Sequence, residues 1–124
     1  MQFLDGTQTT VLAQDGDNFI FATNDLIHPV SNDNYTIYGG SGQDLIFAGP
    51  GNVTVHGGSG SDLIAAGSGN ATLEAGDGTD VLATNSTGTN VLTGGRGEDA
   101  LIVNRVGTNT LLGGSGHDLF ILKE

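Results

Sequence analysis

Apolar residues occur in short stretches separated by glycine-rich segments. Within the stretches, aliphatic and β-branched residues recur at alternate positions, as Val53 and Val55 do around Thr54. This alternation is typical of a strand with one buried face. No window places apolar residues at the i, i+3, i+4 and i+7 positions of a helix, and glycine is too frequent for one. The pattern therefore predicts short strands, joined by glycine bends, and no helix.

The glycine-rich segments repeat at a nearly constant period. They begin with a Gly-Gly or Ala-Gly pair at positions 39, 57, 75, 94 and 113, so successive starts differ by 18, 18, 19 and 19. Each copy then reads small-Gly-x-Gly-x-Asp-x-apolar-x. The acidic slot holds Asp44, Asp62, Asp80, Asp99 and Asp118, and the apolar slot holds Ile46, Ile64, Leu82, Leu101 and Phe120. Such a period predicts an all-β solenoid whose coils stack about 4.8 Å apart.

A second motif lies halfway between these copies, at positions 51–55, 69–73, 88–92 and 107–111. It contains Asn and Thr but no Asp, and one extra residue in each late half-turn accounts for the longer period of the later copies. Positions 13–21 align with 39–47, with Asn18 in the acidic slot, and 34–37 align with 52–55. We therefore expect one domain over 1–124, with irregular first coils over 1–38, an excursion loop at 22–29 and regular repeats over 39–121.

Composition narrows the function. The 124 residues include no Cys, which excludes disulfides and Cys-ligated metal centres. Fourteen acidic residues against three basic ones give a net charge of −11, which disfavours nucleic acid and anionic membrane surfaces as partners and favours cations. The apolar runs are short, so we expect no membrane insertion.

The aspartates form the candidate metal site. Stacked coils would place them in one file about 5 Å apart, where neighbouring carboxylates repel by roughly 1–3 kcal/mol. The glycine bends would add backbone carbonyls, and an all-oxygen ligand set suits several Ca²⁺ ions. The core is thin, so folding should be coupled to metal binding. The candidate ligands are Asp44, Asp62, Asp80, Asp99 and Asp118 with Gly40, Gly42, Gly58, Gly60, Gly76, Gly78, Gly95, Gly97, Gly114 and Gly116, and, from the irregular first copy, Asp15, Asp17 and Asn18.

The segment Gly39–Phe47 and its copies resemble the RTX nonapeptide, the haemolysin-type calcium-binding repeat. The resemblance covers 39–121 and implies a right-handed parallel β-roll, with Ca²⁺ held between successive bends by loop carbonyls and the motif Asp. It also implies leaderless type I secretion and folding in extracellular calcium; Met1–Gly6 shows no signal-peptide pattern. Rolls of this family usually carry the Asp motif on both edges. Here the second edge has Asn34, Asn52, Asn70, Asn90 and Asn109, so we expect no strong calcium file there.

No catalytic constellation is evident. His28, His56 and His117 lie in different half-turns without a shared motif, and we expect solvent-facing positions for His117 and for His56, just after a strand. Thr54, Thr72 and Thr110 resemble an ice-binding file, but Val91 interrupts it. The sequence thus favours a non-enzymatic, extracellular, calcium-stabilised structural protein. The alternatives are an adhesin or ice-binding module and an accessory repeat domain of a type I-secreted toxin or enzyme.

The two ends suggest self-association. The sequence shows no polar cap beside the apolar segments Phe3-Leu4 and Leu119–Leu122. Two open solenoid ends predict a head-to-tail contact that yields filaments. In that contact, the Asp118 bend would share calcium near Asp15 and Asp17, and Phe120 would pack with Phe19 and Ile20. The alternative is a segment of a longer repeat array.

Overall fold

The structure is a computed structural model that describes residues 2–4, 10–13, 15–22 and 34–124. These residues form parallel strands and no helix, so the all-β prediction is confirmed. The described part contains no helix that could cross a membrane. The odd-numbered strands are β1 (Gln2–Leu4), β3 (Phe19–Ala22), β5 (Leu45–Ala48), β7 (Leu63–Ala66), β9 (Val81–Thr84), β11 (Ala100–Asn104) and β13 (Leu119–Lys123). The even-numbered strands are β2 (Thr10–Leu12), β4 (Asn34–Ser41), β6 (Asn52–Ser59), β8 (Ala71–Gly78), β10 (Thr89–Gly97) and β12 (Thr108–Ser115).

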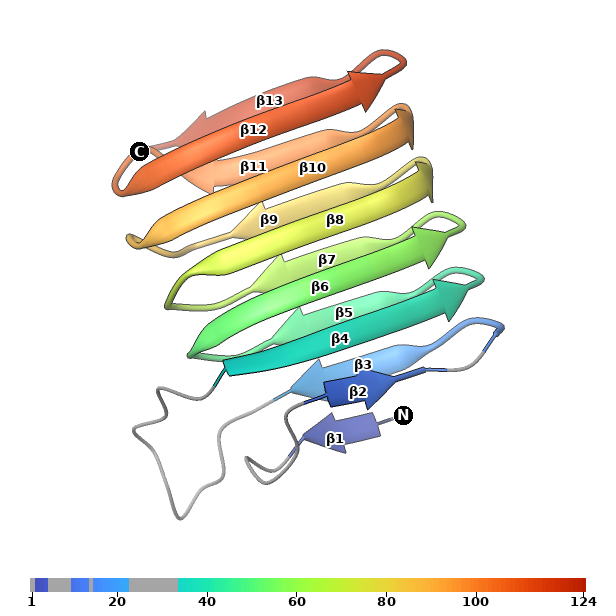
Figure 1. Cartoon of the computed structure of the whole chain (residues 1–124). Coiled ribbons are helices and arrows are strands. Elements are labelled where there is room, and N and C mark those ends of the chain that lie inside the picture. The colour runs from blue at the N-terminus through green and yellow to red at the C-terminus, as the bar shows by residue number, and fades with distance from the viewer. Residues whose placement is uncertain (1, 5–9, 14, 23–33) are drawn as a thin grey trace.

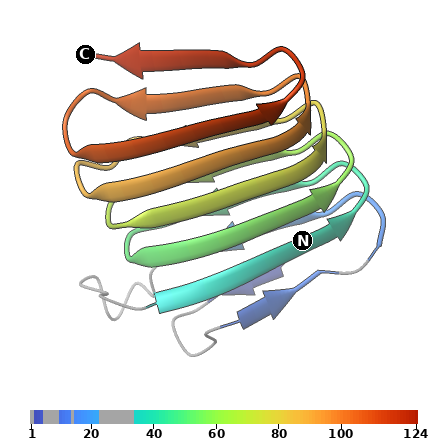
Figure 2. The same cartoon turned by 45° about the horizontal axis from the view of Figure 1, so that its top comes forward.

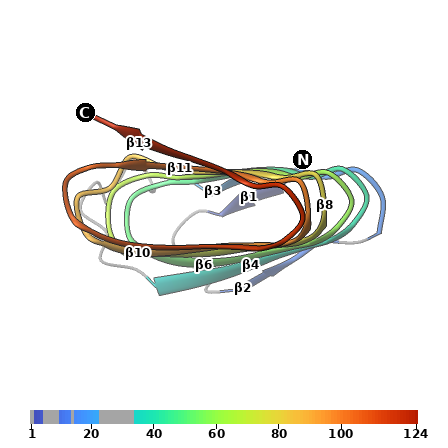
Figure 3. The ribbon, with the colours of Figure 1, turned by 90° about the horizontal axis from the view of Figure 1, so that it is seen from above.

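The strands alternate between two layers (Figure 1). The odd strands form a seven-stranded sheet in the order β1-β3-β5-β7-β9-β11-β13, and the even strands form a six-stranded sheet in the order β2-β4-β6-β8-β10-β12. Each strand therefore pairs with the strand one coil away, and the chain winds up as stacked coils (Figure 2). Seen along the stack, the coils superimpose as a flattened oval (Figure 3). This arrangement confirms the parallel β-roll.

The register follows the sequence period. In the early coils paired residues are 18 positions apart, as Leu63 and Val81 are. In the later coils they are 19 positions apart, as Ala71 and Asn90 are. The extra residue lies in the turn between β9 and β10, where Ser86 is buried and its hydroxyl donates to the carbonyl of Gly69 and accepts from the amide of Gly88 at 2.9 Å.

The irregular first coils follow the same frame. Phe19 pairs with Leu45, as the alignment of the first copy predicts. Of the predicted excursion loop, Ala22 belongs to β3, and the rest lies outside the described residues. The described part of the first 38 positions therefore stacks in register with the regular repeats.

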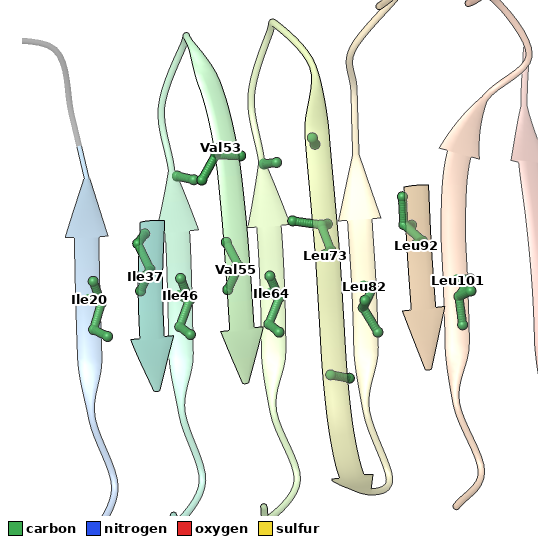
Figure 4. Packing of buried hydrophobic residues seen from close by; sticks show 14 of the residues in the cluster. Ile20, Ile37, Ile46, Val53, Val55, Ile64, Leu73, Leu82, Leu92 and Leu101 are labelled. Carbon is green, nitrogen blue, oxygen red and sulfur yellow. The ribbon is translucent and has the colours of Figure 1, made fainter. Parts of the chain in front are cut away.

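The core lies between the two sheets. The odd strands contribute Ile46, Ile64, Leu82 and Leu101, which are fully buried, and Ile20, which is almost fully buried. Residues such as Ile37, Val55, Leu73 and Leu92 pack against them from the even strands (Figure 4). Each such side chain stabilises the fold by roughly 1.5–3 kcal/mol. The apolar slot of the repeat is thus the inward position of the odd strands.

The outward positions of the two sheets differ. On the even strands they hold polar residues such as Thr36, Thr54 and Thr72, as a strand with one buried face requires. On β5, β7, β9 and β11 they are apolar except for Asn104, at the end of β11. The prediction of strands with one buried face is therefore confirmed, but the outward face of the odd strands is apolar as well, because their apolar runs continue through the outward positions.

Candidate calcium-binding edge

The five repeat aspartates form one file along an edge of the roll. Each follows the glycine bend that joins an even strand to the next odd strand. The side chains of Asp44, Asp62, Asp80 and Asp99 are 1–3% exposed, and Asp118 in the last coil is half-buried. Stacking in register therefore brings these predicted residues together, and it buries their carboxylates.

One oxygen of each carboxylate links adjacent coils. The backbone amide of Asp44 donates to Oδ1 of Asp62 at 2.9 Å, and that of Asp62 donates to Oδ1 of Asp80 at 2.7 Å. The amide of Asp80 donates to Oδ1 of Asp99 at 3.0 Å, and that of Asp99 donates to Oδ1 of Asp118 at 3.1 Å. Such bonds to a charged acceptor are stronger than neutral ones. They hold each carboxylate in the gap between two coils.

The other oxygen is buried without a partner. Oδ2 of Asp44, Asp62, Asp80 and Asp99 accepts no hydrogen bond. A point at the Cβ position of Gly39 would lie 2.5 Å from both Oδ2 of Asp44 and the carbonyl oxygen of Gly57. At Gly57, the same point would lie 2.6 Å from both Oδ2 of Asp62 and the carbonyl oxygen of Ala75. Carboxylate and carbonyl oxygens therefore gather around space that the missing methyl groups leave open.

The gap between the first bend and the Asp44 bend shows which kind of group fits among these oxygens. Asn18 occupies the acidic slot there, and its backbone amide donates to Oδ1 of Asp44 at 2.9 Å, as the later aspartates do. Its carboxamide nitrogen donates to the carbonyls of Gly16 and Gly39 at 2.6 and 3.3 Å and to Oδ1 of Asp44 at 3.0 Å. A group with positive partial charge thus sits among oxygens from two coils. In later gaps the side chain in this slot is a carboxylate, which cannot donate to these oxygens when it is charged, so a bound cation would suit the space.

The burial perturbs the acids. Burial, together with the smaller effect of the negative charges of Asp62 and Asp99, raises the pKa of Asp80 from 3.8 to about 6, although the hydrogen bond from the Asp62 amide lowers it. Burial likewise raises the pKa of Asp62 and of Asp99, where Asp44 and Asp118 are the neighbouring charges. A bound cation reverses this balance because it favours the charged carboxylate.

The predicted glycines shape the bends. All of them have positive φ, which L side chains rarely adopt. At Gly58, where φ is 119°, a methyl group would also collide with the carbonyl oxygen of Gly40 in the preceding coil. The bend therefore needs glycine both for its backbone angle and for the close approach of the next coil.

The donor set fits Ca²⁺ on these observations. In the described residues no three His, Cys, Asp or Glu side chains converge on one point, so backbone carbonyls must complete any site. Ca²⁺ accepts six to eight oxygen ligands in flexible geometry, whereas Mg²⁺ requires a tight octahedron. The carbonyls of Gly57, Ala75 and Gly113, which lie beside the Asp Oδ2 atoms, were not among the predicted ligands. The sequence feature that could have identified these carbonyls as ligands is the small residue at the first position of every repeat.

The candidate ligands of the irregular first copy, Asp15, Asp17 and Asn18, make contacts of a different kind. Asp15 and Asp17 are exposed in the first bend, where Oδ1 of Asp17 accepts the amide of Gln43 at 2.8 Å. The carboxamide nitrogen of Asn18 donates to the carbonyl of Gly16 and to Oδ1 of Asp44.

The histidines do not form a site. His56 lies inside β6, not after a strand as expected, because β6 continues through the glycine pair. Its Nδ1 pairs with Oε2 of Glu74 at 2.8 Å, and its ring stacks on Tyr38. His117 is exposed, as predicted, and His28 lies outside the described residues.

The second-edge asparagines fall into two sets, as their different slots predict. Asn34, Asn52 and Asn70 form an exposed ladder, in which Nδ2 of Asn52 donates to Oδ1 of Asn34 at 2.8 Å. Asn90 is fully buried and donates to Oδ1 of Asn109 at 2.9 Å. Neutral carboxamides thus satisfy one another on this edge.

An open groove of about 420 Å³ crosses the outer face of the six-stranded sheet, on the side of β2, β4, β6 and β8. Its lining contains hydroxyl, carboxamide and apolar groups but no titratable side chain: Thr10, Asn34, Thr36, Asn52, Val53, Thr54, Asn70 and Thr72. The Thr file on this face is interrupted at Val91, as the sequence indicates. The groove is separate from the aspartate file.

Comparison with known proteins supports the site. The family model for the RTX calcium-binding nonapeptide repeat matches four copies, at residues 38–73, 56–86 and 106–121, which together cover just over half of the chain. No curated protein and no solved structure gave a significant match. RTX nonapeptide repeats bind calcium, and Asp44, Asp62 and Asp80, which carry buried oxygens without a partner, lie within the matched repeats. Asp99 lies between the matched segments. The chain therefore belongs to the family of RTX calcium-binding repeat proteins.

Proposed function

We propose that this chain is a non-enzymatic, extracellular structural module that folds when calcium binds along the aspartate file. The observation that carries the proposal is the set of four buried Oδ2 atoms without hydrogen-bond partners. Leaving even one charged oxygen buried and unpaired costs several kcal/mol. The thin hydrophobic core does not offset the cost of four such groups, so the calcium-free fold is unstable at neutral pH. Calcium binding would then supply the free energy of folding.

The role of each residue follows from this coupling. The Asp side chains bind the ion and hold adjacent coils through their Oδ1 hydrogen bonds, and the bend carbonyls complete the oxygen shell. An unfolded chain in calcium-poor surroundings and a folded one in calcium-rich surroundings suit leaderless type I export. RTX repeats are typical of proteins secreted by that route. The membership of this family supports an extracellular location for the folded protein.

Circular dichroism and equilibrium dialysis test the proposal. With excess chelator at pH 7.5 we expect a mostly disordered chain, and millimolar Ca²⁺ should produce the β signal. Asp62→Ala should lower the number of bound ions, because it removes a carboxylate from the file. Asn52→Ala is the matched control on the other edge and should leave that number unchanged. A chelated chain that is fully folded, or equal loss of calcium in both variants, would reject the proposal.

The last coil supports end-to-end assembly as an additional part of this proposal. Phe120 and Leu122 of β13 align with the fully buried Leu101 and Val103 of β11, yet they are 44% and 58% exposed. The coil thus presents core residues and an unpaired strand edge to whatever stacks on it. The predicted packing of Phe120 with Phe19 and Ile20 is wrong, because β1 already covers β3 on that side. We expect a second subunit to stack on β13 through the β1 end of its first coil. Such a heterologous contact repeats without closing.

Particle length distinguishes filaments from single rolls. Electron microscopy of the calcium-loaded protein should show rods longer than one roll, and Phe120→Asp should shorten them. Val106→Asp changes a residue that is also exposed, at 63%, but lies in a turn, so it should leave the length unchanged. Single short rods at high protein concentration, or long rods with Phe120→Asp, would rule out end-to-end assembly.

A further inference from the structure

On the outer face of the seven-stranded sheet, the described outward positions of the odd strands from β3 to β13 are apolar except for Asn104 and Lys123, at the ends of β11 and β13. On β5, β7 and β9 the two outward positions hold Leu45 and Phe47, Leu63 and Ala65, and Val81 and Ala83. Their neighbours in each strand are buried in the core, so strand alternation sends these side chains outward. They are partly exposed, and Leu63 reaches 39%. Two columns of apolar side chains therefore run along the roll, parallel to the stack in Figure 1.

Between β5 and β11 this face is uncharged on a strongly acidic molecule. The strands β5, β7, β9 and β11 read LIFA, LIAA, VLAT and ALIVN, so none of their residues carries a charge. The opposite sheet instead carries Asn, Thr, His56 and Glu74 outward. Parallel sheets with apolar residues on both faces are covered on both faces in known folds. A contiguous apolar patch of this kind marks an interaction surface.

We propose that this face docks against the same face of a second copy of the chain. Two molecules of net charge −11 repel each other, and they approach best through a surface without charge. Lys123, at the end of the outermost strand β13, is the one charged group among the described outward positions of this face, so the central part of the face has none that would select a charged partner. Because both copies have the same spacing between coils, their columns of side chains match in register when two faces are related by a two-fold axis. The two sheets would then lie about 10 Å apart.

The area of the face indicates how stable the proposed dimer is. Four residues at about 3.3 Å each give a strip about 13 Å wide, and the six odd-numbered strands from β3 to β13 at about 4.8 Å give a length of about 30 Å. Two such faces cover about 800 Å², and the relief of the side chains raises the buried accessible surface to roughly 1,000 Å², which lies at the lower limit for a specific interface. We therefore expect a concentration-dependent dimer rather than an obligate one.

Sedimentation equilibrium on the calcium-loaded chain tests the pairing. We expect a monomer–dimer equilibrium across the micromolar range for the Phe120→Asp chain, in which end-to-end stacking is blocked, and the variants below are compared in that background. Replacing both Leu63 and Val81 by Gln should weaken the dimer at least tenfold, since these residues lie in the central part of the face. The matched control replaces Thr54 and Thr72, outward on the opposite sheet, by Gln and should leave the equilibrium unchanged. Circular dichroism in calcium checks that each variant folds.

A single cysteine gives a second measurement that does not depend on weakening the fold. The chain has no Cys, and Ala65 lies outward on β7, the central strand of the sheet. Ala65→Cys should form a disulfide-linked dimer on mild oxidation, whereas Thr54→Cys should not.

Three results would overturn the pairing. The proposal fails if the folded chain stays monomeric, or if the Gln variants of both faces dimerise equally. It also fails if Phe120→Asp alone abolishes association, which would assign it to the ends of the roll. A chain that does not fold in calcium would instead contradict the proposed function.

Discussion

Replacing Asp80 by Asn separates the two effects of the buried carboxylate. The carboxamide oxygen still accepts the amide of Asp62, which donates at 2.7 Å in the structure, so the link between coils is kept. The substitution removes the negative charge and replaces Oδ2, which has no partner, by an NH₂ group. We expect the calcium-free roll to become more stable and the calcium-bound roll to become less stable. The characteristic result is a change in the free energy of unfolding that is positive without calcium and negative with it.

The magnitude comes from the pKa of Asp80, which burial raises from 3.8 to about 6. This difference corresponds to about 3 kcal/mol between the charged and neutral forms, and relaxation around the side chain reduces the net effect to about 1–3 kcal/mol. The raised pKa means that the folded chain binds the proton more tightly. The stability gained from protonation is therefore fully present below about pH 3.8 and is lost as the pH rises through about 6. Above that pH the calcium-free fold is destabilised by the full cost of burying the charged Asp80 carboxylate.

Circular dichroism measures both parts. In chelator, the β signal of the unmodified chain should rise as the pH falls from 7.5 through about 6, and Asp80→Asn should move this transition to higher pH. In a calcium titration at pH 7.5, the same variant should need more Ca²⁺ to reach the folding midpoint. Loss of β signal on acidification of the calcium-free chain, or a lower calcium midpoint for Asp80→Asn, would refute the reasoning.

Three further substitutions probe single features of the roll. Asn18→Asp replaces the carboxamide that bridges Gly16, Gly39 and Asp44, so equilibrium dialysis should find one more bound Ca²⁺; an unchanged count would contradict the role given to Asn18. Gly57→Ala places a methyl group 2.6 Å from the nearest oxygens, and calorimetry should show weaker calcium binding; unchanged affinity would show that this space is not used. Asn90→Ala leaves buried polar groups unpaired, so urea unfolding in calcium should show a loss of about 1–3 kcal/mol, with the number of bound ions unchanged.

The sequence by itself determined the architecture and the aspartate file. A nearly constant period with a short strand in each half can only stack in parallel, so residues one period apart become neighbours. This places Asp44, Asp62 and Asp80 in one line, and the inward alternation places Ile46 and Ile64 in the core. These outcomes depend on spacing and side-chain type, both of which are visible in the chain.

Only the folded structure shows which carboxylate oxygens are hydrogen-bonded and which way the outward apolar side chains point. Backbone carbonyls have no residue signature, so only the stacked coils show that Oδ1 of Asp62 is bonded while its Oδ2 faces the carbonyl of Ala75. Asn18 reads as a degenerate ligand in the sequence, and only its contacts show that it donates to the surrounding oxygens. The apolar runs of the odd strands look like ordinary core segments. Whether Leu63 points into the core or out of it depends on the register of the sheet, because shifting a strand by one residue exchanges its two faces.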